Sequence, residues 1–371
     1  MKVVFLKENK GENRIAITPD QVKILSAKFD VAVSKDYGIA FGYPDEHYIR
    51  SNAKILSKKD IKEADLIVKL SALTFWELKA IKKISQILIT NMFLANNTPY
   101  LKTLLKNGIT SLGIEIFHKS SVYTWLIENA KIKAAFATDG LKSYLLKNNK
   151  KKLLTNAINN LDNKLTYVIV NYSYATNELI KLILKANNDV VLCESNKAYE
   201  HLIKNDTHII NALSKSIGKL TLLDSTFDTL VEETKKADVV INTTTIPGDK
   251  THLKITHEMI KNMKNNCIFI DLGADQGIGC EDVKCYNTVK KPFSIIENKV
   301  FICLNNIPSI FALESSKYTS EFICSIVSCF EKDTIETIKN DIHIKNAIQT
   351  FGRELTNQTI GKALTLTVTN I

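Results

Sequence analysis

One stretch of the sequence has the layout of a nucleotide-binding unit but lacks the glycines that such a unit normally contains. Residues 167–170 and 190–192 are short apolar runs rich in β-branched residues, as expected of buried parallel strands. Between them apolar residues recur at helical spacing, and Thr176 or Asn177 can cap that helix. Glu194 follows about twenty residues after the first turn, where an acidic side chain can hydrogen-bond a ribose hydroxyl.

The turn between the first strand and the helix is where the pattern departs from a phosphate-binding site. Residues 170–175 read VNYSYA in place of G-x-G-x-x-G. Side chains in this segment would crowd the helix N-terminus, where a pyrophosphate is normally bound by backbone N–H groups. The segment therefore predicts a βαβ scaffold whose phosphate cradle is degenerate.

Composition excludes several classes of protein. The chain has 371 residues, a net charge of +10, and 45% hydrophobic residues, which predicts a globular protein of two domains. Only three of its 49 basic residues are arginines, so the positive charge indicates a solvated lysine-rich surface and not a nucleic-acid-binding site. The seven cysteines form no C-x-x-C pair, and no metal site is predicted. No apolar run is long enough to span a membrane, so we expect a soluble, cytoplasmic protein.

Strand-like and helical segments alternate along the whole chain, which predicts an α/β fold with two Rossmann-like domains and doubly wound, largely parallel sheets. A long helical segment is predicted from about residue 122 to residue 146, followed by a polar, lysine-rich stretch. We place a domain junction in this region. The expected domains are a substrate domain of residues 1–130 and 306–371 and a nucleotide-binding domain of residues 131–305, with the C-terminal helices completing the first domain.

Five segments in colinear order resemble alanine dehydrogenases and the NAD-binding subunit of proton-translocating transhydrogenases. They are ENRIAITPDQV (12–22), GIAFGYPDEHYIRSNAKI (38–55), ADLIVKL (64–70), ADVVINTTTIPGDKTHLKITHEMIKNMKNNCIFIDLGADQG (237–277) and LNNIPS (304–309). Because they extend over nearly the whole chain, the sequence is identified as a divergent member of this family, most like alanine dehydrogenase.

The resemblance implies roles for individual residues. Arg14 would hold the substrate carboxylate, and Lys69 would contact the substrate carbonyl or amine. Asp275 would lie near the nicotinamide and act with Lys69 in catalysis. The family's cofactor-binding positions correspond to Ser173, Ala175, Glu194 and Asn306. Some of these residues also have a non-functional interpretation. Arg14 and Lys69 could be surface cations, Asp275 could cap a turn, and Glu194 could be an ordinary acid at a strand end.

The sequence departs from the family at the general acid/base histidine, whose position is occupied by Phe93. Phenylalanine cannot transfer a proton, and loss of a positioned acid or base typically slows catalysis about 10²- to 10⁴-fold. His118, His252 and His257 are candidates to replace it, but no spacing favours one of them. The glycine-free turn is the second departure, because Ala175 stands where the family has its last glycine.

Three functions follow from these observations. The first, implied by the resemblance, is an NAD-dependent alanine dehydrogenase-like oxidoreductase that interconverts L-alanine with pyruvate and ammonia, with this activity either retained or lost. The second is a catalytically inactive member that serves as a binding, regulatory or assembly subunit. The third is a transhydrogenase-type NAD-binding subunit. The expected ligands are NAD, whose binding the turn makes doubtful, and a small amino acid or 2-oxo acid, and we expect a homo-oligomer.

Overall fold

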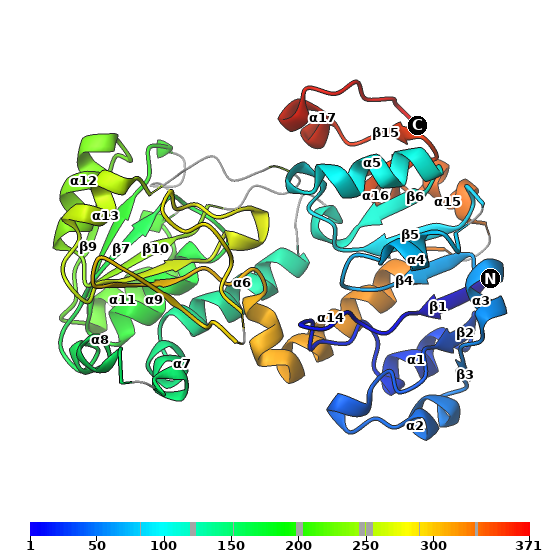
Figure 1. Ribbon diagram of the computed structural model, residues 1–371, viewed down its shortest axis with the longest axis horizontal. Helices are drawn as coiled ribbons and strands as arrows, with labels where there is room; N and C mark the ends of the chain where they lie inside the picture. The colour runs from blue at the N-terminus through cyan, green and yellow to red at the C-terminus, as the bar shows by residue number, and fades with distance from the viewer. Residues whose placement is uncertain are drawn as a thin grey trace. The chain divides into compact units, whose positions relative to one another are not determined.

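The computed structural model describes residues 1–81, 83–118, 124–150, 152–197, 203–244, 249, 255–288, 290–330 and 333–371 (Figure 1). The chain forms two compact units. The first is built mainly from Met1–Glu128 and Pro308–Ile371, and the second from the sequence between them.

The first unit contains an eight-stranded sheet with the strand order β15-β14-β6-β5-β4-β1-β2-β3. The strands from β3 to β6 run parallel, and β14 and β15 add an antiparallel edge. The strands are β1 (Lys2–Phe5), β2 (Asp30–Val33), β3 (Lys54–Ile55), β4 (Leu66–Val68), β5 (Ile87–Thr90), β6 (Thr110–Gly113), β14 (Ile348–Phe351) and β15 (Glu354–Leu355).

Helices and short 3₁₀ turns complete the first unit. They are α1 (Pro19–Leu25), η1 (Ile39–Phe41), α2 (Asp45–Arg50), α3 (Lys58–Glu63), α4 (Phe75–Leu78), η2 (Leu94–Asn96), α5 (Thr98–Asn107), η3 (Ile114–Ile116), η5 (Ile307–Phe311), α14 (Ala312–Val327), α15 (Thr334–Asn340), α16 (Ile342–Ala347) and α17 (Gln358–Leu364). Side chains alternate across the sheet, so Val3 and Phe5 of β1 enter one apolar cluster and Val4 enters another.

The second unit contains a seven-stranded sheet with the order β12-β13-β11-β10-β7-β8-β9, parallel except for β12. Its strands are β7 (Thr166–Val170), β8 (Asp189–Cys193), β9 (Leu220–Leu223), β10 (Val239–Asn242), β11 (Ile268–Asp271), β12 (Ser294–Ile296) and β13 (Lys299–Ile302). Helix α6 (Thr124–Ala137) begins in the first unit and continues into the second. The other helices of the second unit are α7 (Leu141–Asn148), α8 (Thr155–Asn160), α9 (Thr176–Lys185), α11 (Thr207–Lys215), α12 (Phe227–Lys236) and α13 (His257–Asn262), together with the 3₁₀ turn η4 (Ala274–Gln276).

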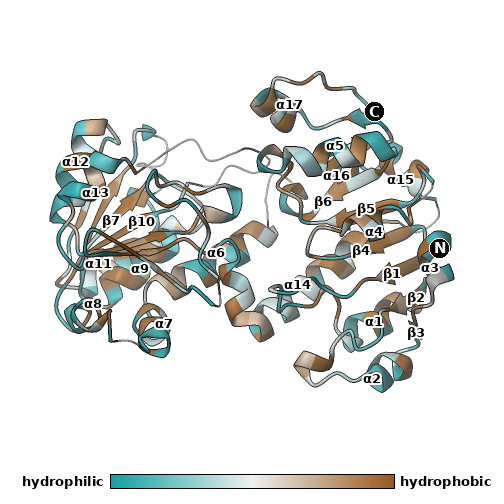
Figure 2. Cartoon of the chain, viewed as in Figure 1, coloured by the Kyte–Doolittle hydropathy of each residue, from teal (hydrophilic) through white to brown (hydrophobic). Residues whose placement is uncertain are grey.

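The central strands of both sheets are strongly hydrophobic along their length (Figure 2). Strands β5, β10 and β13 are buried at every position. Parallel strands with both faces covered require such continuous apolar runs, which is why these segments could be recognised in the sequence. The predicted α/β class with two largely parallel sheets is confirmed.

The strand order reverses next to β1 in the first sheet and next to β7 in the second. In open α/β sheets, ligands bind beyond the carboxyl ends of the strands at such points. Residues that follow β1 and β4, and those that follow β7, β8 and β10, are therefore where a site should be sought.

The prediction of one helix from about residue 122 to residue 146 is wrong. The described chain has two helices, because α6 ends at Ala137 and α7 begins at Leu141. Gly140 lies between them, and its N–H group donates to the carbonyl of Ala135 in a turn that ends α6. Glycine is a poor residue for a helix interior, which explains the break. Among the described residues, no helix is long and apolar enough to cross a membrane.

Candidate functional site

Lys69 directly follows β4 and is almost fully buried, with 1% of its surface exposed. Its Nζ donates to both carboxylate oxygens of Glu77, at 2.8 and 2.9 Å, and to Oδ1 of Asn9, at 2.8 Å. Glu77 is itself fixed, because it also accepts hydrogen bonds from the N–H and hydroxyl groups of Thr74 at the start of α4. The surface-cation alternative for Lys69 is excluded, and its ammonium group already has three protein acceptors.

Arg14 lies on the segment that follows β1 and is also buried, at 4% exposure. Its guanidinium donates from Nε and Nη2 to the two oxygens of Glu12, at 2.9 and 2.8 Å. Its carbon Cζ lies 5.7 Å from the centre of the Trp125 ring. This forked arrangement is the one by which arginine binds any carboxylate. The protein's own Glu12 thus occupies the position that a substrate carboxylate would take on these two donors.

The backbone around Arg14 is held by serine side chains from the C-terminal part of the chain. Ser309 accepts a hydrogen bond from the N–H of Asn13 at 2.7 Å, and Ser316 of α14 accepts one from Ile15 at 3.0 Å. Asn9, which accepts the hydrogen bond from Lys69, lies on the same segment after β1 as Arg14.

Glu8 is a largely buried acid in this region that sequence reasoning missed. Its carboxylate accepts hydrogen bonds from the N–H groups of Leu70 and Ser71, at 2.8 and 2.7 Å, and from the Ser71 hydroxyl at 2.6 Å. Burial raises its pKa to about 7, against the opposing effect of these donors. In the sequence, Glu8 lies within a run of charged residues. The only signal that could have identified it is its position after a buried strand.

Phe93 follows β5 and adopts a left-handed backbone conformation, with φ of +44°. Bulky residues seldom adopt this conformation, and where they do the surrounding structure must hold them in it. The N–H groups of Met92 and Phe93 both donate to Oε1 of Glu115, at 3.3 and 3.0 Å. The position expected to carry the acid/base group is therefore rigidly held but has no proton to transfer.

The three candidate histidines have different surroundings. His118 contacts the carbonyl oxygen of Ile116 through Nδ1, at 3.1 Å. His257 belongs to the second unit, where Nδ1 lies 2.7 Å from Oδ2 of Asp282 and this hydrogen bond raises the pKa of the imidazole. His252 lies outside the described residues.

Asp275 lies in η4 of the second unit and is paired with a lysine that sequence reasoning missed. Nζ of Lys133, in α6, lies 2.6 Å from Oδ2 of Asp275 and also donates to the carbonyl of Leu272 at 2.8 Å. The other oxygen, Oδ1, is buried and accepts no hydrogen bond from the described residues. Lys133 and Asp275 are 142 residues apart in the sequence, so only the fold could reveal this pair.

A buried polar network connects the ends of β7, β10 and β11. Asp271 accepts hydrogen bonds from Asn242 Nδ2 at 2.9 Å and from the N–H groups of two glycines, and burial raises its pKa to about 6. Asn242 in turn accepts from the hydroxyl of Thr244, and Thr244 accepts from Nδ2 of Asn171 at 3.0 Å. The network ends at the glycine-free turn.

Side chains of the protein itself accept hydrogen bonds from three backbone N–H groups of the turn. Asn171 takes the left-handed conformation usual for glycine, with φ of +64°, which asparagine tolerates. The N–H of Tyr172 donates to Glu194 at 2.7 Å, that of Ser173 to the Thr176 hydroxyl at 2.8 Å, and that of Ala175 to the Ser173 hydroxyl at 3.2 Å.

These contacts decide whether a pyrophosphate fits. A dinucleotide is held by free N–H groups at the start of the helix, and here three of them are satisfied by the protein's own side chains. Glu194 also accepts from the N–H of Asn196 at 2.8 Å, so both of its oxygens bind backbone. The residues present therefore do not fit the pyrophosphate of NAD.

The prediction that Thr176 or Asn177 caps α9 is wrong. Ala175 is the capping residue, without a side-chain hydrogen bond to the helix. Thr176 is the first helical residue and its hydroxyl accepts from Ser173 instead, while Asn177 donates to Asp206 at 3.0 Å.

The remaining residue predicted to bind the cofactor, Asn306, lies between β13 and η5.

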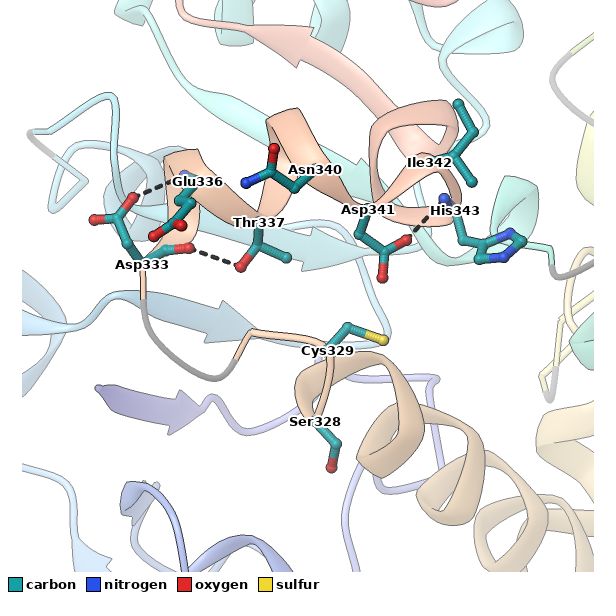
Figure 3. A pocket seen from close by; sticks show the side chains of 9 residues that line it. All are labelled: Ser328, Cys329, Asp333, Glu336, Thr337, Asn340, Asp341, Ile342 and His343. Atoms are coloured by element: carbon teal, nitrogen blue, oxygen red, sulfur yellow. Dashed lines mark hydrogen bonds between the residues drawn. The ribbon is translucent and has the colours of Figure 1, made fainter.

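A separate cavity of about 580 Å³ lies in the first unit, lined by Ser328, Cys329, Asp333, Glu336, Thr337, Asn340, Asp341, Ile342 and His343 (Figure 3). None of the predicted site residues lines it. Asp333 and Asp341 accept N–H groups at the starts of α15 and α16, so helix capping accounts for these two carboxylates. No group of side chains suited to hold a metal ion occurs among the described residues.

Comparison with known proteins gives consistent matches. The model for "Alanine dehydrogenase/PNT, N-terminal domain" matches residues 4–132, and that for the C-terminal domain matches residues 178–358. Alanine dehydrogenase 1 of Staphylococcus aureus strain MSSA476 is 28% identical over 365 residues, which cover 96% of this chain and 95% of the relative.

Solved structures show the same fold. An L-alanine dehydrogenase superposes with a TM-score of 0.78 at 17% identity, covering 98% of this chain and 99% of that one. The transhydrogenase from Sinorhizobium meliloti gives 0.71 at 17% identity, covering 96% and 99%. The chain belongs to the alanine dehydrogenase/PNT family.

Proposed function

We propose that this protein is an alanine dehydrogenase-type member of its family that binds a small amino acid or 2-oxo acid and has at most residual NAD-linked oxidoreductase activity. The observation that carries this proposal is the turn after β7, where side chains of Glu194, Thr176 and Ser173 take the hydrogen bonds of three N–H groups that a pyrophosphate would need. Ser173, Ala175, Glu194 and Asn306 then keep their family positions without a strong cofactor contact.

Support for ligand binding comes from the first unit. Arg14 and Lys69 are buried cations beyond the carboxyl ends of β1 and β4, where α/β sheets place ligand-binding groups. A small carboxylate would compete with Glu12 for the fork of Arg14, and a carbonyl oxygen would compete with Glu77 or Asn9 for Lys69. Such exchange of one acceptor for another needs only side-chain movement, so the substrate role of this unit can survive.

The proton-transfer part of the reaction has weaker support. Phe93 carries no transferable proton, and the loss of a positioned acid or base slows catalysis about 10²- to 10⁴-fold. Lys69 and Asp275 remain as candidate catalytic groups, each held in an ion pair with a residue of its own unit. We therefore expect turnover to be slow even at saturating NADH.

Titration calorimetry and steady-state assays on the purified chain test the proposal. Pyruvate or L-alanine should bind, Arg14→Met should abolish that binding, and NADH should bind weakly or not at all. Micromolar NADH affinity with ordinary turnover of alanine or pyruvate would refute it. Light scattering would test the accompanying expectation of a homo-oligomer.

A second candidate function is a binding, regulatory or assembly subunit without chemistry. The observation that favours it is that both departures, Phe93 and the glycine-free turn, have an ordered set of internal hydrogen bonds. Pyruvate or alanine binding with no detectable NADH oxidation at any cofactor concentration would favour this candidate over a slow enzyme.

A further inference from the structure

Two buried oxygen atoms in the first unit accept no hydrogen bond from any described residue, and their side chains already contact each other. Nε2 of Gln349, on β14, donates to Oε1 of Glu115, on η3, at 2.8 Å. The remaining oxygens, Oε2 of Glu115 and Oε1 of Gln349, have no partner. Glu115 is 1% exposed and Gln349 is 0% exposed, so bulk water does not satisfy either oxygen.

One proton on Oε2 of Glu115 would give both unsatisfied oxygens a hydrogen-bond partner. A carboxylic acid has one O–H donor and one carbonyl acceptor, and a primary amide has the matching N–H donor and oxygen acceptor. We propose that Glu115 is a protonated acid at neutral pH, that it forms a cyclic acid–amide pair with Gln349, and that this pair positions the turn at Phe93. The O–H of Glu115 then donates to the oxygen of Gln349 while the amide of Gln349 donates back.

The electrostatic surroundings agree with a neutral acid. Burial raises the pKa of Glu115, and the only opposing contributions come from neutral donors, namely the Gln349 amide and backbone N–H groups. Strands β5 and β14 and helix α16 pack against β6 and η3. Of these, only α16 carries titratable side chains, His343 and Lys345, and neither contributes to the shift. Among the described residues, no cation contributes to the pKa shift of Glu115.

Gly113 shows that the sheet makes room for this pair. A Cβ atom at residue 113 would lie 1.9 Å from Nε2 of Gln349 and 3.2 Å from Oε1 of Glu115. Any other residue on β6 at this point would displace the amide. The strand end is thus shaped around the contact between Glu115 and Gln349.

The pair has a consequence for the candidate site because Glu115 also holds the backbone of the neighbouring strand end. The oxygen that accepts from Gln349 also accepts from the N–H groups of Met92 and Phe93. These contacts maintain the left-handed conformation of Phe93, at the position that the family resemblance gives to the acid/base residue. Glu115 is therefore a positioning residue for this turn.

A pH profile of stability distinguishes this role from ordinary packing. The folded state holds the Glu115 proton more tightly than the unfolded state, so the wild type loses this contribution as pH rises through the folded pKa. Glu115→Gln has no proton to lose and can form the same ring as an amide pair. The gain in urea midpoint of Glu115→Gln over wild type should therefore grow as the pH rises above the ordinary glutamate value of 4.5 towards the raised pKa of the folded state.

The matched control is Glu354→Gln, which removes one exposed carboxylate from β15 of the same sheet. Its difference from wild type should stay constant over the same pH range. A constant difference for Glu115→Gln as well would overturn the proposal. These outcomes do not depend on NAD or substrate binding.

A direct readout on the wild-type protein keeps the proposal testable even where a variant folds poorly. With ¹³C-labelled glutamate, the carboxyl resonance that disappears in Glu115→Gln should have the chemical shift of a protonated acid at pH 7. It should stay that of a protonated acid when Gln349→Leu removes the amide, because the hydrogen bond from Gln349 lowers the pKa of Glu115 and the site stays buried. A carboxylate resonance for Glu115 in the wild type at pH 7 would refute the proposal.

Discussion

The strand ends of the two units satisfy their polar groups in different ways. In the first unit, the buried cations Arg14 and Lys69 are bound by side chains, mainly those of Glu12 and Glu77. In the second unit, the groups that a cofactor would use are backbone N–H donors of the turn after β7, which are bound by Glu194, Thr176 and Ser173.

This difference shows how far each unit is from accepting a ligand. A side-chain ion pair can rearrange around an incoming carboxylate, because rotamer changes are inexpensive compared with backbone changes. The turn carries a Cβ atom at every residue from 170 to 175, so a phosphate could approach it closely only if the backbone moved. A dinucleotide would therefore require a larger rearrangement of the second unit than a small carboxylate would require of the first.

Restoring the family residues is the change with the largest expected effect. A variant with Asn171→Gly, Ser173→Gly, Ala175→Gly and Phe93→His should gain about 10²- to 10⁴-fold in alanine-dependent NAD reduction, because it regains both the phosphate donors and a proton carrier. Steady-state kinetics measure this gain. The three glycines alone should raise NADH affinity only, and Phe93→His alone should change little. No gain in the combined variant would show that other losses disable the site.

Breaking the buried ion pair of the first unit is expected to have the next largest effect. Arg14→Met should lower the free energy of unfolding by about 3–5 kcal/mol, because it leaves the carboxylate of Glu12 buried without its partner. Fluorescence-monitored urea unfolding is a suitable measurement, since both tryptophans, Trp76 and Trp125, belong to this unit.

Two controls sharpen this test. Adding Glu12→Met to Arg14→Met should recover most of the loss, because replacing both partners leaves no unpaired charge. Lys54→Met removes a pair with Asp30 in which both side chains are well exposed, and it should cost at most about 1 kcal/mol. Equal losses for Arg14→Met and Lys54→Met would contradict the buried pairing.

Each unit contains a buried acid that should make stability depend on pH. Burial raises the pKa of Glu8 to about 7 in the first unit and that of Asp271 to about 6 in the second. The folded state therefore binds these protons more tightly, and the stabilisation present at low pH is lost as pH rises through these values. Carboxyls with lowered pKa, such as Asp60 beside Lys2, complete their titration below this window.

The free energy of unfolding should consequently fall by roughly 2–4 kcal/mol between pH 5 and pH 8. Fluorescence reports the first unit, and circular dichroism reports both, so urea titrations at several pH values can compare the two. Stability that rises over this range would contradict the burial of both acids.

The smallest expected effect concerns the left-handed residue of the turn. Asn171→Ala should cost about 1–2 kcal/mol, because alanine is strained at positive φ, and it also loses the contact with Thr244. Asn171→Gly should cost less, since glycine accepts the conformation. Thermal unfolding followed by circular dichroism measures the difference, and equal costs would mean that backbone strain is unimportant here.

The buried strands and the family could be recognised from sequence because both depend on local patterns. Continuous apolar runs identify β7 and β10, and five colinear segments identify the family. The absent glycines of the turn were equally visible, and the satisfied N–H groups there agree with the doubt they raised about NAD.

The partners of the site residues could not be found in the same way. Lys133 and Asp275 are 142 residues apart, and Glu115 and Gln349 are 234 apart, so neither spacing carries a local signal. The break between α6 and α7 was missed because apolar periodicity continued across Gly140. Glu12 is only two residues before Arg14 in the sequence. Whether the two side chains form a hydrogen bond depends on the backbone conformation, which the sequence does not specify.

The serine contacts from the C-terminal part of the chain have a consequence for biosynthesis. Ser309, Ser316 and Ser320 hold the segment around Arg14 from about 300 residues away in sequence. During synthesis the residues of the second unit emerge before these serines, so that unit can begin folding while the first is still incomplete. Loops of this length close slowly, and the surroundings of Arg14 are expected to be among the last parts of the protein to become ordered.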